Sequence, residues 1–459
     1  MARQRISLSA WVYLAIAVLA LVDAFVHVPS LIPVTAALII AFVVLEFHAV
    51  PMTQKIAGGG LILIGVLGAT GGAAGSENGL DILIDGIARS RLFLLLFFAV
   101  SWLQFPVTQS PALQATRATI ISQPQGRRYM CMAFGVHIIG SVLNLAGLSL
   151  LANMVEGQKD PLLRRRLAMA LINGFGSASA WSPFFIGMIV VLVAIPSLTW
   201  GDIGPLGFIL TFAIISTSWA YDRLVLRPPT TAETATEPVP LSGTNFWRMA
   251  GILISLIVLA LSIVEVSGVS IPVTLGLMGP PFALIWYSMI GQRGARFPFR
   301  ARRLIGDVLS SLPSMRNEVL VFVAVNIFGV GIASLIPSGD LGAAVNTVLP
   351  WADAKIIAII AFFLSASAIG LHPVIIVISL TAVLPPEALG LQDWVVGLTY
   401  AGIWGVSTMV SPFSGTTLFM SRVTGTPAHI IGWRWMLPTS MINGCVIAAI
   451  VIGLRHVLG

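Results

Sequence analysis

A short polar string occurs twice in this chain, each time inside a stretch that is otherwise strongly apolar. Residues 176–184 read GSASAWSPF and residues 405–413 read GVSTMVSPF, so Gly, Ser, Pro and Phe recur at the same positions. Glycine and proline together interrupt a helix, and backbone groups freed inside a membrane must be covered by protein or line a polar cavity. Two interrupted spans in matching halves predict a transporter binding site. The alternative is that both strings are only kinks in structural helices.

The composition of the chain indicates a membrane protein. Of its 459 residues, 57% are hydrophobic and only 9% are charged, which excludes a water-soluble globular protein. The net charge of +7 comes from basic residues in short loops, so it indicates membrane topology and not nucleic-acid binding. Cys131 and Cys445 lie in apolar segments without histidine partners, and we expect no metal site and no cofactor other than a sodium ion.

The apolar stretches predict an all-α polytopic membrane protein with about 11 transmembrane helices, two of them broken, and two re-entrant hairpins. Arg3 and Arg5 precede the first apolar run, which lacks a cleavage pattern, so we expect a retained first helix. The expected spans are 9–25, 29–48, 56–73, 90–105, 167–198 (broken), 203–223, 247–267, 269–291, 318–338, 393–421 (broken) and 429–454.

Two further apolar stretches do not fit as simple crossings, and we interpret each as a re-entrant hairpin. Residues 129–154 have arginines on both flanks, at 127–128 and at 164–166. A straight crossing would export one of these clusters, against the tendency of basic loops to stay cytoplasmic. Residues 353–384 are about one and a half times as long as a membrane-spanning helix, and they carry a glycine and a proline near their middle.

The distribution of charge predicts the orientation. With the amino terminus cytoplasmic, all but four of the 25 Lys and Arg residues lie inside; the exceptions are Arg89, Arg91, Lys355 and Arg455. We therefore expect a multi-pass protein of the bacterial inner membrane, with a cytoplasmic N-terminus and a periplasmic C-terminus.

The same topology makes the two halves inverted copies of each other. Each half carries an amphipathic surface stretch, acidic and outside at 78–89, basic and inside at 302–317. The residues between the halves are rich in Pro, Thr and Glu, which is typical of a disordered connector. The expected parts are an N-terminal helix at 1–28, a first inverted repeat at 29–225, a cytoplasmic linker at 226–245 and a second inverted repeat at 246–459.

The expected hairpin tips read GSVLNLAG at 140–147 and SASAIGLHP at 365–373, and the second break continues as SPFSGTT at 411–417. In this order of elements the chain resembles the ion transporter superfamily. That group includes divalent anion/sodium symporters, citrate and arsenite permeases, and the large subunits of tripartite dicarboxylate transporters. The resemblance implies that hairpin tips and broken helices hold the ligand. Neither hairpin here has the Ser-Asn-Thr triplet that those families carry at the tip.

The candidate site residues are the polar groups of these tips and breaks, because no charged residue lies at the centre of a span. Among these residues, His372 is the strongest single candidate for a functional role. A lone membrane histidine is commonly a hydrogen-bonded structural residue, and the alternative is a substrate donor or a proton-coupling group. The candidates for substrate binding are Ser141, Asn144, Ser179, Ser182, Ser367, His372, Thr408, Ser411, Ser414 and Thr416. The candidates for cation binding are Asn144, Gly176, Ser177, Gly405 and Ser407.

The sequence predicts a secondary active transporter that moves a small organic anion, such as a carboxylate, across the inner membrane by alternating access. Helix ends and hydroxyls can hold an oxyanion, and carbonyl and amide oxygens can hold sodium. No catalytic motif is present, so we do not expect an enzyme. Two alternatives stay open: the membrane subunit of a binding-protein-dependent tripartite transporter, and a passive anion channel. Coupling to sodium or to protons, and association as a homodimer, also stay open.

Overall fold

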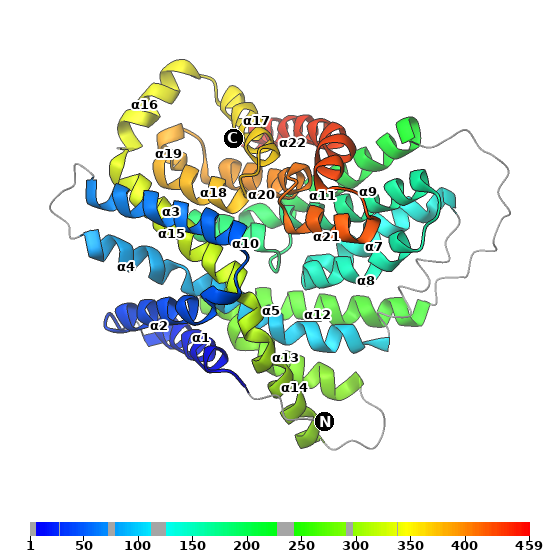
Figure 1. The fold of residues 1–459 in the computed structure, drawn as a ribbon. Coiled ribbons are helices and arrows are strands. Elements are labelled where there is room, and N and C mark those ends of the chain that lie inside the picture. The colour runs from blue at the N-terminus through cyan, green and yellow to red at the C-terminus, as the bar shows by residue number, and fades with distance from the viewer. Residues whose placement is uncertain are drawn as a thin grey trace. The chain divides into compact units, whose positions relative to one another are not determined.

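The computed structural model describes residues 6–26, 28–71, 79–111, 125–226, 243–290, 297–336 and 338–459. All regular elements in these ranges are helices, and the chain is an all-α polytopic membrane protein (Figure 1). Eight of the described helices are long and apolar enough to cross a membrane unbroken. The two predicted broken spans, 167–198 and 393–421, are not among the eight, and in the structure each is interrupted between two helices.

The chain forms two compact units, and each unit takes segments from both halves of the sequence. Unit 1 contains residues 1–111 and 250–338, and unit 2 contains residues 112–249 and 339–459. Most of the predicted linker, 227–242, lies outside the described residues.

Unit 1 consists of long helices that pair closely. A Cβ atom on Gly65 would lie 2.6 Å from the carbonyl oxygen of Ile327, and one on Gly331 would meet the carbonyl of Gly65. These glycines let α3 and α15 approach to backbone contact, and α5 and α13 form a second close pair. The helices are α1 (Leu8–Val26), α2 (Leu31–Glu46), α3 (Met52–Gly71), α4 (Gly79–Arg89), α5 (Arg91–Gln109), α12 (Gly243–Ser267), α13 (Ile271–Ile290), α14 (Phe297–Ser311) and α15 (Arg316–Leu335).

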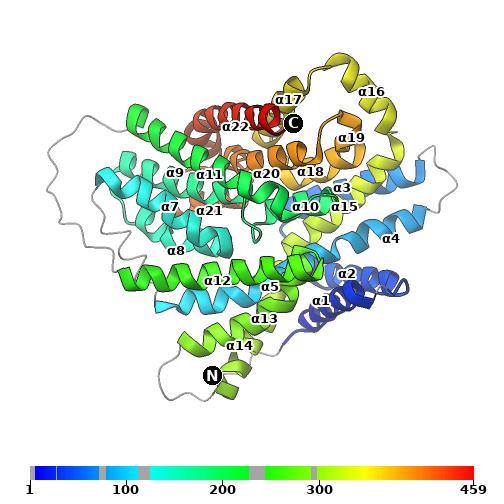
Figure 2. The ribbon, with the colours of Figure 1, turned by 180° about the vertical axis from the view of Figure 1, so that it is seen from behind.

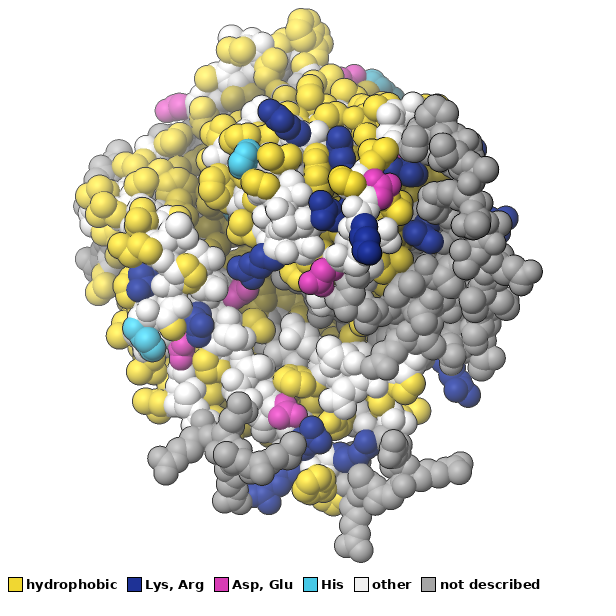
Figure 3. Space-filling model, turned by 45° about the vertical axis from the view of Figure 1, so that its right-hand side comes forward, with side chains coloured by type: hydrophobic (Ala, Val, Ile, Leu, Met, Phe, Trp, Pro, Cys, Tyr) yellow, Lys and Arg dark blue, Asp and Glu magenta, His cyan; other side chains and the backbone are white. Residues whose placement is uncertain are grey.

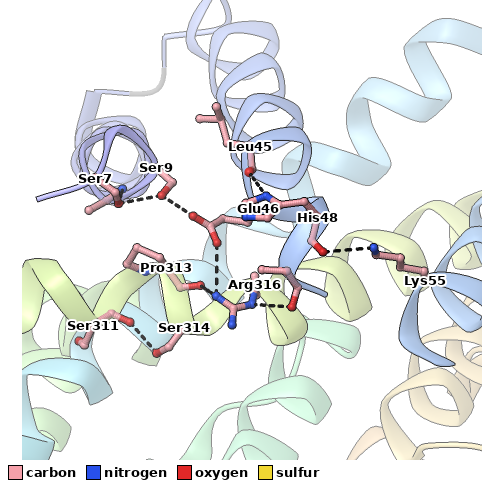
Figure 4. A network of polar contacts seen from close by, with 12 residues as sticks. Ser7, Ser9, Leu45, Glu46, His48, Lys55, Ser311, Pro313, Ser314 and Arg316 are labelled. Atoms are coloured by element: carbon pink, nitrogen blue, oxygen red, sulfur yellow. Dashed lines mark hydrogen bonds and ion pairs between the residues drawn. The ribbon is translucent and has the colours of Figure 1, made fainter. Parts of the chain in front are cut away.

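A polar network joins three helices of unit 1 at one end (Figure 4). Glu46, at the end of α2, accepts a hydrogen bond of 2.5 Å from Ser9 of α1. Its second oxygen lies 3.4 Å from Nη1 of Arg316, and Arg316 Nε donates to the Ala49 carbonyl at 3.1 Å. The Glu46 side chain is only 11% exposed, so the arginine compensates a largely buried carboxylate.

Unit 2 contains shorter helices and all the sequence-predicted site residues. Its helices are α7 (Gln125–Leu143), α8 (Leu145–Glu156), α9 (Pro161–Ser177), α10 (Ile186–Ala194), α11 (Trp200–Tyr221), α16 (Ser338–Val348), α17 (Ala352–Ala368), α18 (Pro373–Val383), α19 (Pro386–Leu389), α20 (Asp393–Val410), α21 (Gly415–Thr424) and α22 (Leu437–Leu458). Short 3₁₀ or π turns lie at Ala178–Ala180 (η2), Asp222–Leu226 (η3) and Ile430–Met436 (η5). Helix α16 was not predicted; it meets α17 at a bend of 106°.

Candidate functional site

Two helices of unit 2 are interrupted at the repeated polar string. In the first, α9 and η2 end at Ala180, and α10 begins at Ile186 after an irregular segment. In the second, α20 ends at Val410 and α21 begins at Gly415. We call these irregular segments the first break (181–185) and the second break (411–414). Helices α9, α10 and α11 can be followed from behind in Figure 2.

The two interrupted helices cross at the glycines that begin the repeated string. A Cβ on Gly405 would meet the carbonyl of Gly176, and one on Gly176 would lie 3.1 Å from the carbonyl of Gly405. Ser179 reinforces this crossing, because its hydroxyl accepts from Gly405 N at 3.0 Å and donates to Ala401 O at 3.1 Å. The crossing therefore requires glycine at 405, and it favours glycine at 176, where a Cβ would meet chiefly the end of the Met409 side chain.

Matching residues of the two strings make matching local bonds. Ser179 donates to Gly176 O at 2.9 Å, and Thr408 donates to Gly405 O at 2.7 Å. Within each break, the serine of the Ser-Pro-Phe sequence accepts a hydrogen bond from the backbone amide of the phenylalanine two residues later. These bonds are Phe184 N to Ser182 Oγ at 3.2 Å and Phe413 N to Ser411 Oγ at 3.4 Å.

The element that comes after each interrupted helix covers its exposed backbone in the same way. Gly207 of α11 lies against Ala180 O, and Gly432 of η5 lies against Val410 O. A hydroxyl of the covering segment then donates a hydrogen bond to a backbone carbonyl of each interrupted helix. Thr211 donates to Ser177 O at 2.8 Å, and Ser440 donates to Val406 O at 3.4 Å. Each interrupted helix is thereby covered on two sides, by the other interrupted helix and by the element that comes after it.

The first hairpin is tied to the first break at its tip. Asn144 separates α7 from α8 and has φ of 51°, the left-handed conformation that Asn tolerates better than most residues. Its side-chain nitrogen donates to Phe184 O at 3.1 Å, and the Ser182 hydroxyl donates to Ser141 O. Ser141 itself donates to Ile138 O at 2.9 Å. The amide oxygen of Asn144 is left without a partner among the described residues.

A buried network fixes His137 beside the first break. Trp181 donates its indole N–H to His137 Nε2 at 3.1 Å, so the ring proton is on Nδ1. Nδ1 lies 3.0 Å from Ser177 Oγ, which in turn donates to Gly174 O at 2.9 Å. Every polar atom of the imidazole is thus satisfied by protein. We conclude that His137 has a structural role, in keeping with its absence from the predicted site.

The second hairpin turn lies against the second break. Gly370, with φ of 110°, makes the turn between α17 and α18, and a Cβ on it would lie 2.7 Å from the Phe413 ring. His372 caps α18, because its Nδ1 accepts the amide of Val374 at 3.2 Å. The proton of the ring is therefore on Nε2, which makes no hydrogen bond to a described residue. The ring packs edge-to-face against Trp404, with centroids 6.0 Å apart.

The second break also keeps hydrogen-bond donors that the protein does not use. Ser411 accepts the Phe413 amide but donates to no described residue, and the Thr416 hydroxyl has no partner there. Ser367, three residues before the hairpin glycine, has a buried hydroxyl without a partner. Ser414 is engaged as the cap of α21, since it accepts Thr417 N at 3.1 Å and donates to Thr417 Oγ1 at 2.9 Å.

The structure thus divides the predicted site residues into two groups. Ser141, Ser179, Ser182, Thr408 and Ser414 have hydroxyls engaged by protein, whereas Ser367, His372, Ser411 and Thr416 keep free donors. The predicted cation ligands other than Asn144 are also engaged. The oxygens of these residues, Gly176, Ser177, Gly405 and Ser407, take part in the bonds of the helix crossing or bond within their own helix.

Sequence reasoning missed the part played by Trp404. This side chain is only 1% exposed and covers Gly187 at the start of α10, so it lies between the first interrupted helix and His372. It immediately precedes the paired Gly405, and Phe175 precedes Gly176 in the other string. Phe175 occupies the matching place, against Gly140 of the first hairpin. Extending the aligned string by one residue towards the N-terminus would have found this pair of large aromatic residues.

Comparison with solved structures finds this fold in a transporter. The Alcanivorax borkumensis YdaH transporter, described as having an unusual topology, matches with a TM-score of 0.54 and 13% identity, over 84% of this chain and 89% of that one. Neisseria gonorrhoeae MtrF, described as illuminating a class of antimetabolite efflux pumps, matches with a TM-score of 0.41 and 12% identity, over 98% of this chain and 95% of that one. The first match shows a shared fold. No known protein family and no curated protein matches the sequence.

Proposed function

We propose that the chain is a secondary active transporter for a small organic anion of the carboxylate type, working by alternating access in a bacterial inner membrane. The observation that carries this proposal is the set of unused donors at the second break and second hairpin turn. Ser367, Ser411, Thr416 and the Nε2–H of His372 offer hydrogen-bond donors that no described residue accepts. Unused donors near helix ends suit a ligand that is rich in acceptors, as a carboxylate is.

The start of α21 adds a favourable field for an anion. The backbone amides of Gly415 and Thr416 are the first two of the helix, and neither donates to a described residue. Free amides and the helix dipole together favour negative charge at this end. Among the described residues, no Lys or Arg forms a salt bridge at the second break, so we expect one or two negative charges on the substrate rather than more.

We propose that the first break has a structural role in the helix crossing and does not bind the substrate. Its serine, its hairpin tip and its neighbouring histidine all bond to protein. We propose that sodium, if it is the coupling ion, binds at the free amide oxygen of Asn144 with nearby carbonyl groups, since oxygen ligands suit a bare alkali cation. The rival is a proton carried by His372. The paired contacts of the two halves support an inverted repeat, with the cytoplasmic N-terminus and periplasmic C-terminus expected above.

The proposal is tested first by binding. Purified protein is screened by thermal shift against mono-, di- and tricarboxylic acids, aliphatic and aromatic, with sodium or potassium as the only cation. We expect at least one carboxylate to raise the melting temperature, and the rise to shrink in Thr416→Val and His372→Gln. Thr347→Val and His429→Gln are matched controls, because both side chains are exposed. A carboxylate that stabilises all four variants equally would place the binding site elsewhere.

Flux of the same carboxylate into proteoliposomes then separates a carrier from its alternatives. A carrier saturates and shows counterflow, in which internal unlabelled substrate drives uptake of label. Linear flux without counterflow indicates an anion channel. Binding without any flux by the purified chain indicates a subunit that depends on partner proteins.

A further inference from the structure

Four arginines of unit 2 lie on elements that pack against one another. Arg164 and Arg165 are in the first turns of α9, Arg422 is in the last turn of α21, and Arg434 is in η5. Helix α21 contacts both α9 and η5. Among the described residues, none of the four arginines takes part in a salt bridge. In the view of Figure 3, Lys and Arg side chains at the surface lie among hydrophobic side chains.

Two tryptophans accompany these arginines. The guanidinium carbon of Arg165 lies 5.9 Å from the ring centroid of Trp435, and its Nη2 donates to Arg434 O at 3.5 Å. Arg165 Nε is buried and has no hydrogen-bond partner in the described part of the chain. The Trp433 ring is 47% exposed, and its N–H is held by Ala368 O at 3.0 Å. Tryptophan beside arginine at helix ends is typical of the border between membrane and water.

Arg166, the next arginine along α9, differs from these four arginines because it has a carboxylate partner. Arg166 makes a two-bond pair with Asp222, with Nε–Oδ1 of 2.8 Å and Nη2–Oδ2 of 2.9 Å. Arg164 and Arg165 have no such carboxylate partner among the described residues. Their charge, together with that of Arg422 and Arg434, is therefore left for a ligand to balance.

We propose that Arg164, Arg165, Arg422 and Arg434 form a binding surface for the phosphate headgroup of an anionic phospholipid. Guanidinium groups donate paired hydrogen bonds to phosphate oxygens, and several arginines can share one phosphodiester. The exposed face of Trp433 then packs against the glycerol and upper acyl region. The topology expected from the sequence places all four arginines on the cytoplasmic side, where anionic lipids attract basic segments.

The test is a titration of the full-length, detergent-solubilised protein with fluorescent dioctanoyl phosphatidylglycerol, followed by anisotropy. The variant Arg422→Gln/Arg434→Gln is expected to raise Kd about 25-fold, since each of the two basic residues removed contributes about fivefold near an anionic lipid. The control Arg248→Gln/Arg302→Gln removes the same charge from exposed arginines outside the cluster, and its Kd is expected to stay near wild type. Melting temperatures without lipid show that both double variants are folded.

Three results would overturn the proposal. An equal loss of affinity in both double variants would mean that only the overall potential of the protein attracts the lipid. Equal affinity for dioctanoyl phosphatidylcholine would mean that the headgroup charge is not recognised. Full displacement by inorganic phosphate at the same concentration as the lipid would mean that the arginines form a site for a small oxyanion.

Discussion

The crossing of the two interrupted helices makes a sharp prediction for Gly405→Ala. The added methyl carbon would meet the carbonyl of Gly176 and lie 2.6 Å from Ser179 Oγ. Because the obstacle includes backbone, the helices must separate, and overpacking of this kind costs about 1–3 kcal/mol. Separation also breaks the bonds from Gly405 N to Ser179 and from Ser179 to Ala401 O, at about 1 kcal/mol each. The expected loss is therefore about 3–5 kcal/mol.

Gly415→Ala is the matched control for this substitution. It lies in the same interrupted helix, at the start of α21, and a Cβ there would meet nothing within 4 Å. Alanine favours a helix over glycine by about 1 kcal/mol, so this variant is expected to be as stable as wild type or slightly more stable.

The assay is thermal unfolding of purified protein in detergent, followed by the loss of monodisperse material. A loss of 3–5 kcal/mol in a unit of this size corresponds to a fall in melting temperature on the order of 10 °C. If Gly405→Ala melts together with Gly415→Ala, the close backbone approach is not a feature of the folded protein, and the derived role of Ser179 fails with it.

Three further predictions concern the hairpin, the polar network of unit 1 and the topology. Asn144→Gly should have a higher melting temperature than Asn144→Ala, because glycine adopts the left-handed turn without strain. If sodium binds the Asn144 amide oxygen, both variants should need more sodium for half-maximal uptake. Equal melting temperatures together with an unchanged sodium dependence would contradict this account. Arg316→Met should lower stability by about 1–2 kcal/mol, whereas Arg303→Met, whose pair with Asp307 is exposed, should cost under about 0.5 kcal/mol. Cysteines at Gln125 and Gln158 should both resist an impermeant external thiol reagent, and labelling of either in intact cells would contradict the first hairpin.

Much of the fold could be predicted because apolar length and helix-breaking residues act locally. The structure has helices α7 and α8 over 125–156, where a hairpin was expected at 129–154, and breaks at both Ser-Pro-Phe sequences. Helix α16 was missed because its sequence, SGDLGAAVNTV, is short and only weakly apolar. Pro350 lies between α16 and α17 and ends the first helix locally, but it does not define the 106° angle between the two helices.

The candidate site was harder to predict, because a hydroxyl's role depends on what folds against it. Ser182 and Ser411 occupy the same place in the repeated string, and sequence gives no reason to separate them. In the structure the Ser182 hydroxyl donates to the first hairpin, whereas the Ser411 hydroxyl donates to no described residue. Ser179 is likewise engaged by the other interrupted helix, through Ala401 O and Gly405 N, whereas Thr408 bonds only within its own helix. The division of the predicted residues into engaged and free donors therefore requires the three-dimensional structure.

The paired serines also provide the most direct test of the central claim, that the second break holds the substrate. Kd for the best carboxylate of the screen is measured by isothermal titration for wild type, Ser411→Ala and Ser182→Ala, with the melting temperature of each protein without ligand. Loss of one neutral hydrogen bond, about 1 kcal/mol, predicts that Ser411→Ala raises Kd about fivefold and leaves the melting temperature unchanged. Ser182→Ala should lower the melting temperature and leave Kd near wild type. The opposite pattern, a raised Kd in Ser182→Ala with an unchanged Kd in Ser411→Ala, would contradict the account.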